Sequence, residues 1–448
     1  MMKMNLADVE TVAYRSYMRL YPDIPEGLDQ HVRHPELTRQ LLDKIGVDDA
    51  SMNNMLVTGS KGKGSLTVLL AHILVHQGKK TGLFTSPHLQ HFKERIRLDG
   101  KALPDDIILA HAVTWKKALD AIEEGLPENV YVGPVGATAA LAMSIYQTLH
   151  TDINVIELGR GARYDDVNQI HGTYAFINRI FLEHGNHLGQ ELAQIAYHKA
   201  GIIKKGMLGV FVARQKPEVE QIILAEAKKM SVPVYCYGKD FSVRHVTLST
   251  EGTTFDYLEE DRVIYKGLTI GLLGHHQAQN AAMALFSLRR MHCIHDEQAM
   301  RASLPQLHWM GRLEIIANNP FTLLDGCISH ECVQHILSIS EKIPRHPVVC
   351  VVGIPEEKDY MGVVSAIKYH VDQLIVTHAT NDFLKFSEHQ VLDIRTIYSE
   401  AVYEPDIKKA ILEAQKRAGQ QGKILYVGTQ SLIKDIKSAY GQSTMDIF

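Results

Sequence analysis

The sequence predicts an α/β protein with a mainly parallel sheet, a small antiparallel β portion and a second, smaller α/β unit. Short apolar runs alternate with segments of helical periodicity as far as about residue 237, which is typical of a parallel sheet covered by helices. Short β-rich runs across residues 241–271, punctuated by Gly252 and Gly267, predict antiparallel hairpins. Beyond residue 311, further strand candidates separated by helices predict the second unit.

Length and composition set broad bounds. A chain of 448 residues is too long for one ordinary core, and we expect two domains, residues 1–304 and residues 305–448. A hydrophobic content of 45% and a charged content of 22% are those of a soluble globular protein. The formal net charge of −4 provides no global field for nucleic acid or membrane, so any polyanionic ligand must meet local positive charge.

The cysteine content and the first ten residues indicate in which cellular compartment we expect the protein. The five cysteines are an odd number and form no C-x-x-C pair, which favours a reducing compartment over a disulfide framework. Residues 1–10 lack the basic-then-apolar layout of a signal peptide, and no uninterrupted run of about 20 apolar residues follows. We therefore expect a cytoplasmic protein that contacts neither nucleic acid nor a membrane.

The remaining chain is organised around residues 56–65, LVTGSKGKGS, which we interpret as a strand, a phosphate-binding loop and the start of a helix. Glycines let the backbone approach an anion closely, and the helix N-terminus adds roughly half a positive charge. Lys63 would neutralise terminal phosphates, and the Ser65 hydroxyl would coordinate Mg²⁺. The regular pattern G-x-x-x-x-G-K-[ST] fails because residue 57 is valine, so the loop is a shorter variant. The alternative interpretation is an ordinary surface loop.

Two further candidates follow apolar runs that we interpret as strands. Glu157 lies at the end of a predicted strand over residues 153–158, where doubly wound sheets place functional groups, and it is a candidate Mg²⁺ ligand. His184 follows a predicted strand over residues 174–182, and we weigh a ligand role equally with a structural one. The charged residues 90–100 fit either an ordered active-site loop or a solvated turn.

The other predicted elements complete the pattern. They are a helical lead-in over residues 9–46 interrupted at Pro22 and Pro25, a short strand over 81–85, helices over 107–122 and 136–149, a long helix from 274, and strands over 313–316, 321–324, 348–352, 374–377 and 424–427.

Taken in order, the motifs resemble those of the folylpolyglutamate synthase and dihydrofolate synthase family, within the Mur ligase superfamily of ATP-dependent amide-forming ligases. The resemblance runs from about residue 20 to about residue 440. It is carried by VTGSKGKGS at 57–65, LFTSPHL at 83–89, ERI at 94–96, ELGRGARYDDVN at 157–168, KAGIIK at 199–204, HQ at 276–277 with NAA at 280–282, GRLE at 311–314, DG at 325–326 and KD at 358–359.

This resemblance implies a P-loop ATPase-like central domain, a smaller Rossmann-like domain and a nucleotide held between them. The implied ATP-binding residues are Gly59, Ser60, Lys61, Gly62, Lys63, Gly64, Ser65, Asn280, Arg312 and Asp325. Two Mg²⁺ ions are implied, with ligands at Ser65, Glu157, His184 and a carbamylated Lys199. Lys63, Lys199 and His184 would be the catalytic residues. The substrate positions would be Ser86, Pro87, His88, Arg95, Arg163 and Asp165.

The implied reaction is ATP-dependent joining of a small-molecule carboxylate and an amino acid through an acyl phosphate, by a monomeric enzyme. No protein nucleophile is required, and the sequence shows no nucleophile elbow. The best-supported acceptor is a folate or pteroate that receives L-glutamate.

Several departures from the family pattern leave two alternatives open. Lys61 stands where the family has asparagine, and residues 325–330, DGCISH, stand where it has D-G-A-H-N-P, unless His330 moves into the gap. The family's Phe-Glu before the 136–149 helix and an arginine after the 374–377 strand are also missing. These changes favour, as a first alternative, a ligase acting on a different carboxylate in a specialised pathway. The second alternative is a nucleotide-binding regulatory protein without catalysis, although Glu157, Lys199 and His184 are all retained. A further option is a kinase or simple ATPase, which would release or transfer phosphate without requiring an amine.

Overall fold

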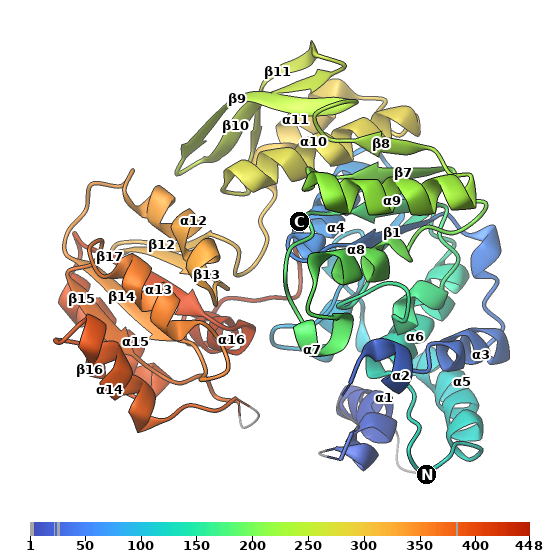
Figure 1. Cartoon of the computed structure of the whole chain (residues 1–448), viewed down its shortest axis with the longest axis horizontal. Helices are drawn as coiled ribbons and strands as arrows, with labels where there is room; N and C mark the ends of the chain where they lie inside the picture. Colours follow the sequence, from blue (N-terminus) through green and yellow to red (C-terminus); the bar gives the residue numbers. More distant parts are fainter. Residues whose placement is uncertain (1–3, 22, 25–26, 382–383) are drawn as a thin grey trace.

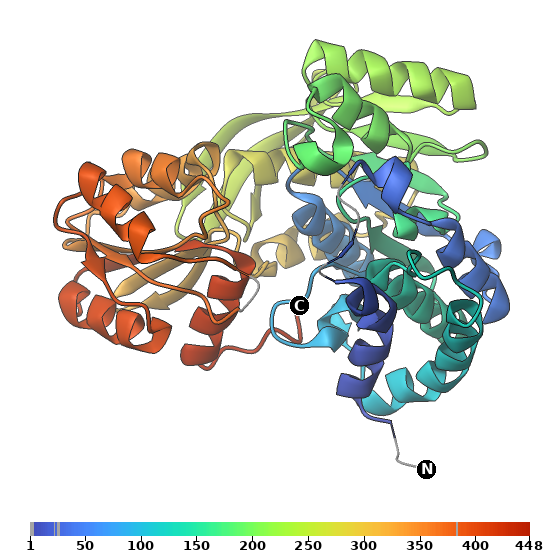
Figure 2. The ribbon, with the colours of Figure 1, turned by 60° about the horizontal axis from the view of Figure 1, so that its bottom comes forward.

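A computed structural model describes residues 4–21, 23–24, 27–381 and 384–448. It contains an eight-stranded sheet of order β4-β3-β2-β5-β1-β6-β7-β8, a three-stranded sheet of order β11-β10-β9, and a six-stranded sheet of order β12-β13-β17-β14-β15-β16. The first two sheets form an N-terminal unit and the six-stranded sheet a C-terminal unit, which lie beside one another in Figures 1 and 2. The α/β class predicted from the sequence is confirmed.

The eight-stranded sheet is parallel except at one edge, where β3 and β4 run antiparallel. Its central strand β1 pairs in parallel with β5 and β6. Such a strand is covered on both faces, and all five residues of β1 are buried. The strands are β1 (Asn54–Thr58), β2 (Thr81–Phe84), β3 (Ile96–Leu98), β4 (Lys101–Ala102), β5 (Ile153–Glu157), β6 (Tyr174–Ile177), β7 (Gly209–Val212) and β8 (Val234–Cys236).

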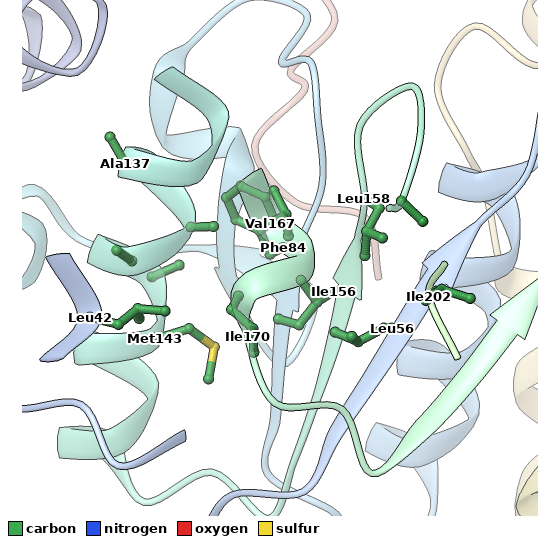
Figure 3. Close-up of a cluster of buried hydrophobic side chains, with 14 of the residues drawn as sticks. Leu42, Leu56, Phe84, Ala137, Met143, Ile156, Leu158, Val167, Ile170 and Ile202 are labelled. Atoms are coloured by element: carbon green, nitrogen blue, oxygen red, sulfur yellow. The ribbon is translucent and has the colours of Figure 1, made fainter. Parts of the chain in front are cut away.

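Two hydrophobic cores cover the two faces of this sheet. Alternate side chains of a strand point to opposite faces, so Leu56 enters one core and Val57 the other. In the first core Leu56 lies with Ile156 and Phe84 beside helical residues such as Met143 (Figure 3). The helices of the N-terminal unit are α1 (Leu6–Leu20), α2 (Asp29–Val32), α3 (Glu36–Lys44), α4 (Lys63–His76), α5 (Asp105–Glu123), α6 (Pro134–Leu149), α7 (Gly185–Leu188), α8 (Leu192–Ala200), α9 (Pro217–Met230), α10 (His275–Arg290) and α11 (Glu297–Ser303).

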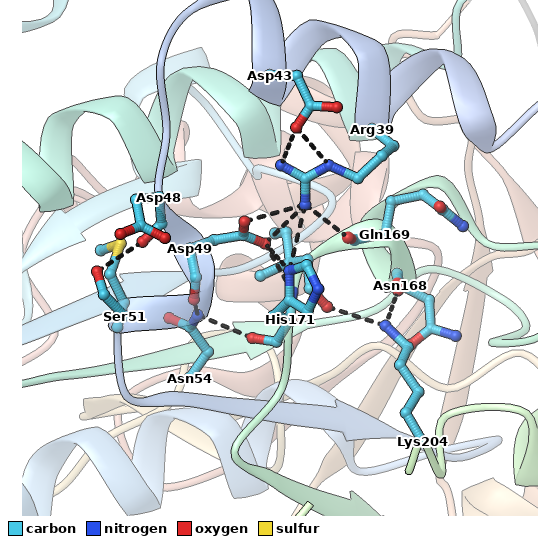
Figure 4. A network of polar contacts seen from close by, with 12 residues as sticks. Arg39, Asp43, Asp48, Asp49, Ser51, Asn54, Asn168, Gln169, His171 and Lys204 are labelled. Atoms are coloured by element: carbon cyan, nitrogen blue, oxygen red, sulfur yellow. Dashed lines mark hydrogen bonds and ion pairs between the residues drawn. The ribbon is translucent and has the colours of Figure 1, made fainter. Parts of the chain in front are cut away.

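The predicted lead-in does pack against this unit. Val9 of α1 and Leu41 of α3 are fully buried in the first core. At the amino ends of the strands, Arg39 donates to both carboxylate oxygens of Asp49 at 3.0 Å, and the Asn54 amide donates to the carbonyl of His171 at 2.9 Å (Figure 4). These bonds pair buried polar groups at the edge of the sheet away from the phosphate loop. Pro22 and Pro25, where the sequence predicts interruptions, lie outside the described residues.

The predicted antiparallel portion is confirmed as the meander β9 (Phe241–Ser249), β10 (Gly252–Glu259) and β11 (Arg262–Ile270). It packs on α10, where the Phe241 and Phe286 rings stack with centroids 5.0 Å apart. Because α10 also packs on α4, this small sheet supports the helix that follows the phosphate loop.

The C-terminal unit is a six-stranded sheet with one antiparallel edge strand, β12. Its strands are β12 (Glu314–Asn318), β13 (Phe321–Asp325), β14 (Val348–Gly353), β15 (Gln373–Val376), β16 (Val402–Tyr403) and β17 (Lys423–Gly428). Its helices are α12 (His330–Ser340), α13 (Tyr360–Ile367), α14 (Glu388–Ile397), α15 (Ile407–Ala418) and α16 (Gln430–Ala439). The change of sheet falls between β11 and β12, and the domain boundary at residues 304 and 305 stays a prediction.

Two expectations need revision. The strand predicted over residues 174–182 ends at Ile177, because Asn178 turns its amide toward Asn280 of α10 and the chain then follows the phosphate loop instead of the sheet. His184 therefore does not terminate a strand. The solvated interpretation of residues 90–100 is wrong as well, since Glu94, Arg95 and Arg97 are buried and β3 lies within the segment.

Gly82 in β2 offers a test of packing beside β5. A methyl group there would lie 2.3 Å from the Asn154 amide oxygen and 2.9 Å from the Tyr146 ring. We expect Gly82→Ala to lower the free energy of unfolding by about 1–3 kcal/mol, because neither neighbour can move freely in the core. Urea unfolding measures the change. Gly125→Ala is the matched control, since the nearest atom would be 3.7 Å away, and an equal effect of both changes would contradict the packing argument.

Candidate active site

The phosphate loop connects β1 to α4 through two glycines that no other residue replaces easily. Gly59 has φ 145° and Gly62 has φ 78°, both in the region that favours glycine. A side chain at Gly59 would also meet Asn178 at 2.7 Å, so the backbone passes close to the segment after β6. Gly62 caps α4 without a side-chain hydrogen bond, which leaves the first-turn amides of the helix open toward an anion.

Side chains of the loop point to three different neighbours. The Lys63 ammonium donates to the carbonyl of Gly59 at 3.0 Å and so lies over its own loop. Ser65 is buried and accepts from the Gln277 amide of α10 at 3.2 Å. The Ser60 hydroxyl donates to the carbonyl of Phe181 at 3.1 Å. A phosphate arriving at the loop would find the Lys63 amine within reach.

Glu157 ends β5, as the sequence predicts, and it is buried. Its carboxylate accepts from the backbone amide of Ser86 at 3.0 Å. Burial raises its pKa, while the nearby charges of Lys63 and Arg312 lower it. A cavity between the N-terminal and C-terminal units is lined by Gly64, Ser86, Glu157, Trp309, Arg312 and Gln430, among others.

Lys199 of α8 is fully buried at the carboxyl ends of the central strands. Its ammonium lies 3.0 Å from the Glu183 carboxylate and donates to the carbonyls of Gly59 at 2.9 Å and Arg160 at 2.8 Å. Burial, together with the charge of Lys63, lowers its pKa to about 8. A larger fraction of the side chain is therefore the neutral, nucleophilic amine near neutral pH than for an exposed lysine.

His184 caps the N-terminus of α7 and is about half exposed. Its imidazole lies 3.8 Å from the Glu183 carboxylate, and burial lowers its pKa to about 4, so it is neutral at pH 7 and able to bind a metal. Sequence reasoning missed Glu183, which contacts both His184 and Lys199. A carboxylate directly before a candidate histidine was the available signal.

The residues of the LFTSPHL and ERI motifs form one polar group. Arg95 donates to the His88 ring at 2.9 Å and to the Tyr14 hydroxyl of α1 at 2.7 Å. Its remaining terminal nitrogen, Nη1, is buried and has no hydrogen-bond partner among the described residues. Burial and the Arg95 charge lower the pKa of His88 to about 4. Ser86 and Pro87 line the cavity directly, and Tyr14 is a neighbour that the sequence did not indicate.

Arg163 and Asp165 make contacts within the N-terminal unit. Arg163 pairs with Glu226 of α9 at 2.9 Å and stacks 4.0 Å over the Tyr197 ring. Asp165 is buried and accepts from the backbone amide of Val167 at 3.0 Å. Neither residue lines the cavity beside Glu157, and their substrate role stays a prediction.

Asn280 reaches the phosphate loop through Asn178. The Asn178 amide donates to the Asn280 side-chain oxygen at 2.9 Å, and the Asn280 amide donates to Gln277 at 3.0 Å. Gln277 in turn bonds Ser65, so α10 supports the loop from both of its ends.

Arg312 and Asp325 belong to the C-terminal unit and lie close together. Asp325 accepts from the backbone amide of Leu313 at 2.8 Å, and burial raises its pKa to about 6 although Arg312 opposes the shift. A Cβ atom at Gly326 would lie 2.3 Å from Arg312 Nη1, so the guanidinium packs closely against the backbone after Asp325. Arg312 faces the cavity opposite Glu157.

Two departures from the family pattern, Lys61 and residues 325–330, lie near Cys332. The Lys61 ammonium contacts the Cys332 thiol of α12, and the Ser329 hydroxyl donates to the same sulfur at 3.2 Å. Hydrogen bonding with the neighbouring Cys327, together with the Lys61 and Ser329 contacts, lowers the pKa of Cys332. His330 begins α12 and is exposed, with its backbone amide bonded to Asp359 at 2.9 Å. The changed motif and the changed loop residue therefore share Cys332 as a neighbour.

The described residues contain no group of three or more His, Cys, Asp and Glu side chains arranged to hold a metal ion. The donor chemistry at the loop nevertheless suits Mg²⁺, which prefers a carboxylate, a hydroxyl and waters. Glu157 and Ser65 supply the first two. In the same described ranges, no helix is both long and apolar enough to cross a bilayer.

Comparison with known proteins finds relatives among the Mur ligases. The Mur ligase middle domain model matches residues 133–288. Folylpolyglutamate synthase of Lacticaseibacillus casei is 28% identical over 332 residues, covering 73% of this chain and 77% of that protein. The dihydrofolate synthase/folylpolyglutamate synthase of Bacillus subtilis is 26% identical over 412 residues, covering 89% and 93%.

Solved structures share the whole fold. Folylpolyglutamate synthase of Mycobacterium tuberculosis, complexed with ADP and AMPPCP, superposes with a TM-score of 0.85 at 23% identity and covers 97% of this chain and 99% of that one. A folylpolyglutamate synthase complex with AMPPCP and folate superposes with a TM-score of 0.77 at 25% identity and covers 97% and 99%. The chain is therefore similar in sequence and in fold to the folylpolyglutamate synthase and dihydrofolate synthase family, and its residues 133–288 match the Mur ligase middle domain.

Proposed function

We propose that this protein is an ATP-dependent ligase that joins an amino acid to a carboxylate through an amide bond, with addition of L-glutamate to a folate or pteroate as its best-supported reaction. The observation that carries the proposal is the meeting of a phosphate loop, Glu157 and Arg312 in one cavity between two units. The names of the relatives and the nucleotides in their structures support the substrates.

In this proposal ATP lies with its phosphates on the loop. The open amides at the start of α4 and the Lys63 ammonium hold the phosphates. The loop residues from Gly59 to Ser65 and Asn280 approach from the N-terminal unit, and Arg312 and Asp325 from the C-terminal unit. Binding between two units favours their closure before the chemical steps.

Mg²⁺ would be held at two positions of the site. Glu157 and Ser65 provide oxygen ligands at the first, and His184 with a carbamylated Lys199 at the second. The ions offset the charge that builds up on phosphoryl oxygens. Carbamylation would replace the Lys199–Glu183 ion pair with two neighbouring anions, which a cation must then neutralise.

The chemistry proceeds in two steps. The acceptor carboxylate attacks the γ-phosphate of ATP, which forms an acyl phosphate and releases ADP. The amine of the amino acid then attacks the acyl carbon, and phosphate leaves. Lys63 and Arg312 stabilise the developing charge on the transferred phosphoryl group, and the residues around His88 and Arg95 hold the acceptor. The Nη1 of Arg95 is buried and has no hydrogen-bond partner in the part of the chain that the structure describes, so it suits an anionic or carbonyl group of that substrate.

The proposal also covers the domain boundary, the oligomeric state and the location of the protein. We propose two domains, residues 1–304 and residues 305–448, in a cytoplasmic monomer. Arg163 and Asp165 remain proposed substrate positions, which act from the loop after β5.

A non-folate acceptor is the second candidate. Lys61 and the altered motif at residues 325–330 both depart from the family pattern, and Ser329 of that motif bonds the Cys332 thiol that Lys61 contacts, which favours an altered substrate. The test is ATP-dependent phosphate release with Mg²⁺ and bicarbonate, using dihydropteroate or tetrahydrofolate with L-glutamate and then other amino acids. Mass spectrometry of a folate product carrying added glutamate supports the proposal. ATP binding without such a product rejects the folate acceptor, and binding without any phosphate release indicates a regulatory protein.

Removing the loop amine tests phosphoryl transfer. We expect Lys63→Ala to lower kcat by about 10²–10³-fold, because one preorganised cation on the transferred group is lost. Steady-state phosphate release measures the change. The exposed Lys205→Ala serves as the control and should match the unmodified protein. Equal kcat for Lys63→Ala and the control would show that the loop does not act on the phosphates.

The lowered pKa of Lys199 predicts a pH-dependent activation by CO₂. Only the neutral amine reacts with CO₂, and its fraction rises with pH up to and beyond about 8. At constant dissolved CO₂, activation should therefore be faster at pH 8.5 than at pH 7, which a time course of phosphate release measures.

The control variant for this activation removes the amine. Lys199→Gln should lose both the CO₂ dependence and most of the activity, whereas Lys205→Gln should keep both. If Lys199→Gln retained CO₂ activation, Lys199 would not be the carbamylated residue.

A further inference from the structure

Residues 441–448 return from the C-terminal unit to the N-terminal unit. Figures 1 and 2 both show the chain leaving α16 and ending beside α4. The segment pairs with the antiparallel edge of the eight-stranded sheet through an isolated bridge between Lys101 and Asp446. The backbone amide of Ala102 donates to the carbonyl of Met445 at 3.2 Å, and the amide of Ile447 donates to Gly100 at 3.0 Å. We call residues 441–448 the strap.

A buried arginine of β3 binds the backbone of the strap. Arg97 of β3 donates to the carbonyl of Thr444 at 2.9 Å and to the carbonyl of Met445 at 3.0 Å. The Phe448 ring meets the His72 ring of α4 edge to face, with centroids 4.8 Å apart. Thr444 is fully buried, so this segment is packed rather than resting on the surface.

Glu94 connects the strap to the loop of residues 86–91, which we call the acceptor loop. This buried carboxylate accepts from the backbone amides of Leu89 at 2.9 Å, Gln90 at 2.9 Å and His91 at 2.7 Å. The Thr444 hydroxyl donates to the same carboxylate at 2.5 Å. The Glu94 carboxylate thus accepts three hydrogen bonds from the acceptor loop and a fourth from the strap.

The other end of the acceptor loop enters the reaction cavity. The Ser86 amide bonds the Glu157 carboxylate, and Ser86, Pro87 and Leu89 line the cavity. A change in the position of the Glu94 carboxylate therefore moves the backbone that lines the acceptor site. The Thr444 hydroxyl lies 2.5 Å from the Glu94 carboxylate and 3.1 Å from the side-chain oxygen of Gln90, so it contacts the acceptor loop directly as well as through Glu94.

We propose that the strap positions the acceptor loop, with Thr444 and Glu94 as the positioning residues, and that it couples the C-terminal unit to the acceptor site. This rests on the proposed function, in which the acceptor loop holds the carboxylate substrate. The coupling joins α16, through residues 441–443, to the Glu94 carboxylate without passing through the nucleotide.

Hydrogen exchange of Thr444→Val tests the positioning without requiring turnover. A hydrogen bond to a charged group contributes roughly ten- to hundredfold to a local opening equilibrium. We therefore expect exchange of the Leu89, Gln90 and His91 amides to accelerate by about tenfold or more, whereas Thr444→Ser, which keeps the hydroxyl, stays near the unmodified protein. Thr396→Val, an exposed threonine of α14, is the matched control. Unchanged exchange in Thr444→Val would overturn the proposal.

A measurement on the unmodified protein covers the case in which Thr444→Val does not fold. Peptides containing residues 89–91 and residues 444–447 should exchange with closely similar protection, because they open together. Strap amides that exchange far faster than those of residues 89–91 would overturn the proposal.

Kinetics separate this proposal from the proposed function. If the protein ligates folate, Thr444→Val should raise the KM for the acceptor several-fold and leave the KM for ATP unchanged, and Thr444→Ser should restore the acceptor KM. An equal rise in both constants would contradict selective positioning. If no substrate turns over, the proposed function fails, and hydrogen exchange alone decides whether the strap orders the acceptor loop.

Discussion

The buried amine of Lys199 is the interaction on which the geometry of the site depends. It joins the segments that follow three neighbouring strands: the carbonyl of Gly59 after β1, the carbonyl of Arg160 after β5 and the carboxylate of Glu183 after β6. A buried cation is tolerated only when it is paired and hydrogen-bonded, and here all its partners belong to the site. The amine therefore holds the phosphate loop at a fixed place relative to the metal-ligand candidates.

A parallel sheet makes that arrangement possible. β1, β5 and β6 are neighbours in register, so their carboxyl ends open toward the same edge. The loop after β1 needs glycine where Asn178 approaches, and the residue that ends β5 is the Glu157 carboxylate. The polar network around Arg39 and Asp49 closes the opposite edge, which leaves one end of the sheet for chemistry.

Those parts of the site that depend on local pattern could be predicted from the sequence. The strand, glycine loop and helix around Lys63 are contiguous, and Glu157 directly ends an apolar run, so both were recognisable. His184 was placed wrongly at a strand end, because apolar residues after Ile177 follow the phosphate loop and not the sheet. An apolar run in a sequence does not show whether the sheet or another part of the fold buries it.

Contacts between segments that lie far apart along the chain could not be predicted from the sequence. Tyr14 beside Arg95, Glu183 beside Lys199 and Thr444 beside Glu94 each join residues whose pairing depends on the completed fold. No periodicity marks such pairs, because each partner alone looks like an ordinary surface or capping residue.

The two units are joined by more than the covalent connection between β11 and β12. Lys61 contacts Cys332 at the phosphate loop, and Thr444 contacts Glu94 beside the loop of residues 86–91. In the proposed function these two loops hold different substrates, so a movement of the C-terminal unit would reach each loop through a separate contact. A shift that separated Lys61 from Cys332 would free a cation for phosphate, while the strap could still hold the acceptor loop. Under the proposed function, nucleotide binding and acceptor binding would then respond differently to one movement of the same unit.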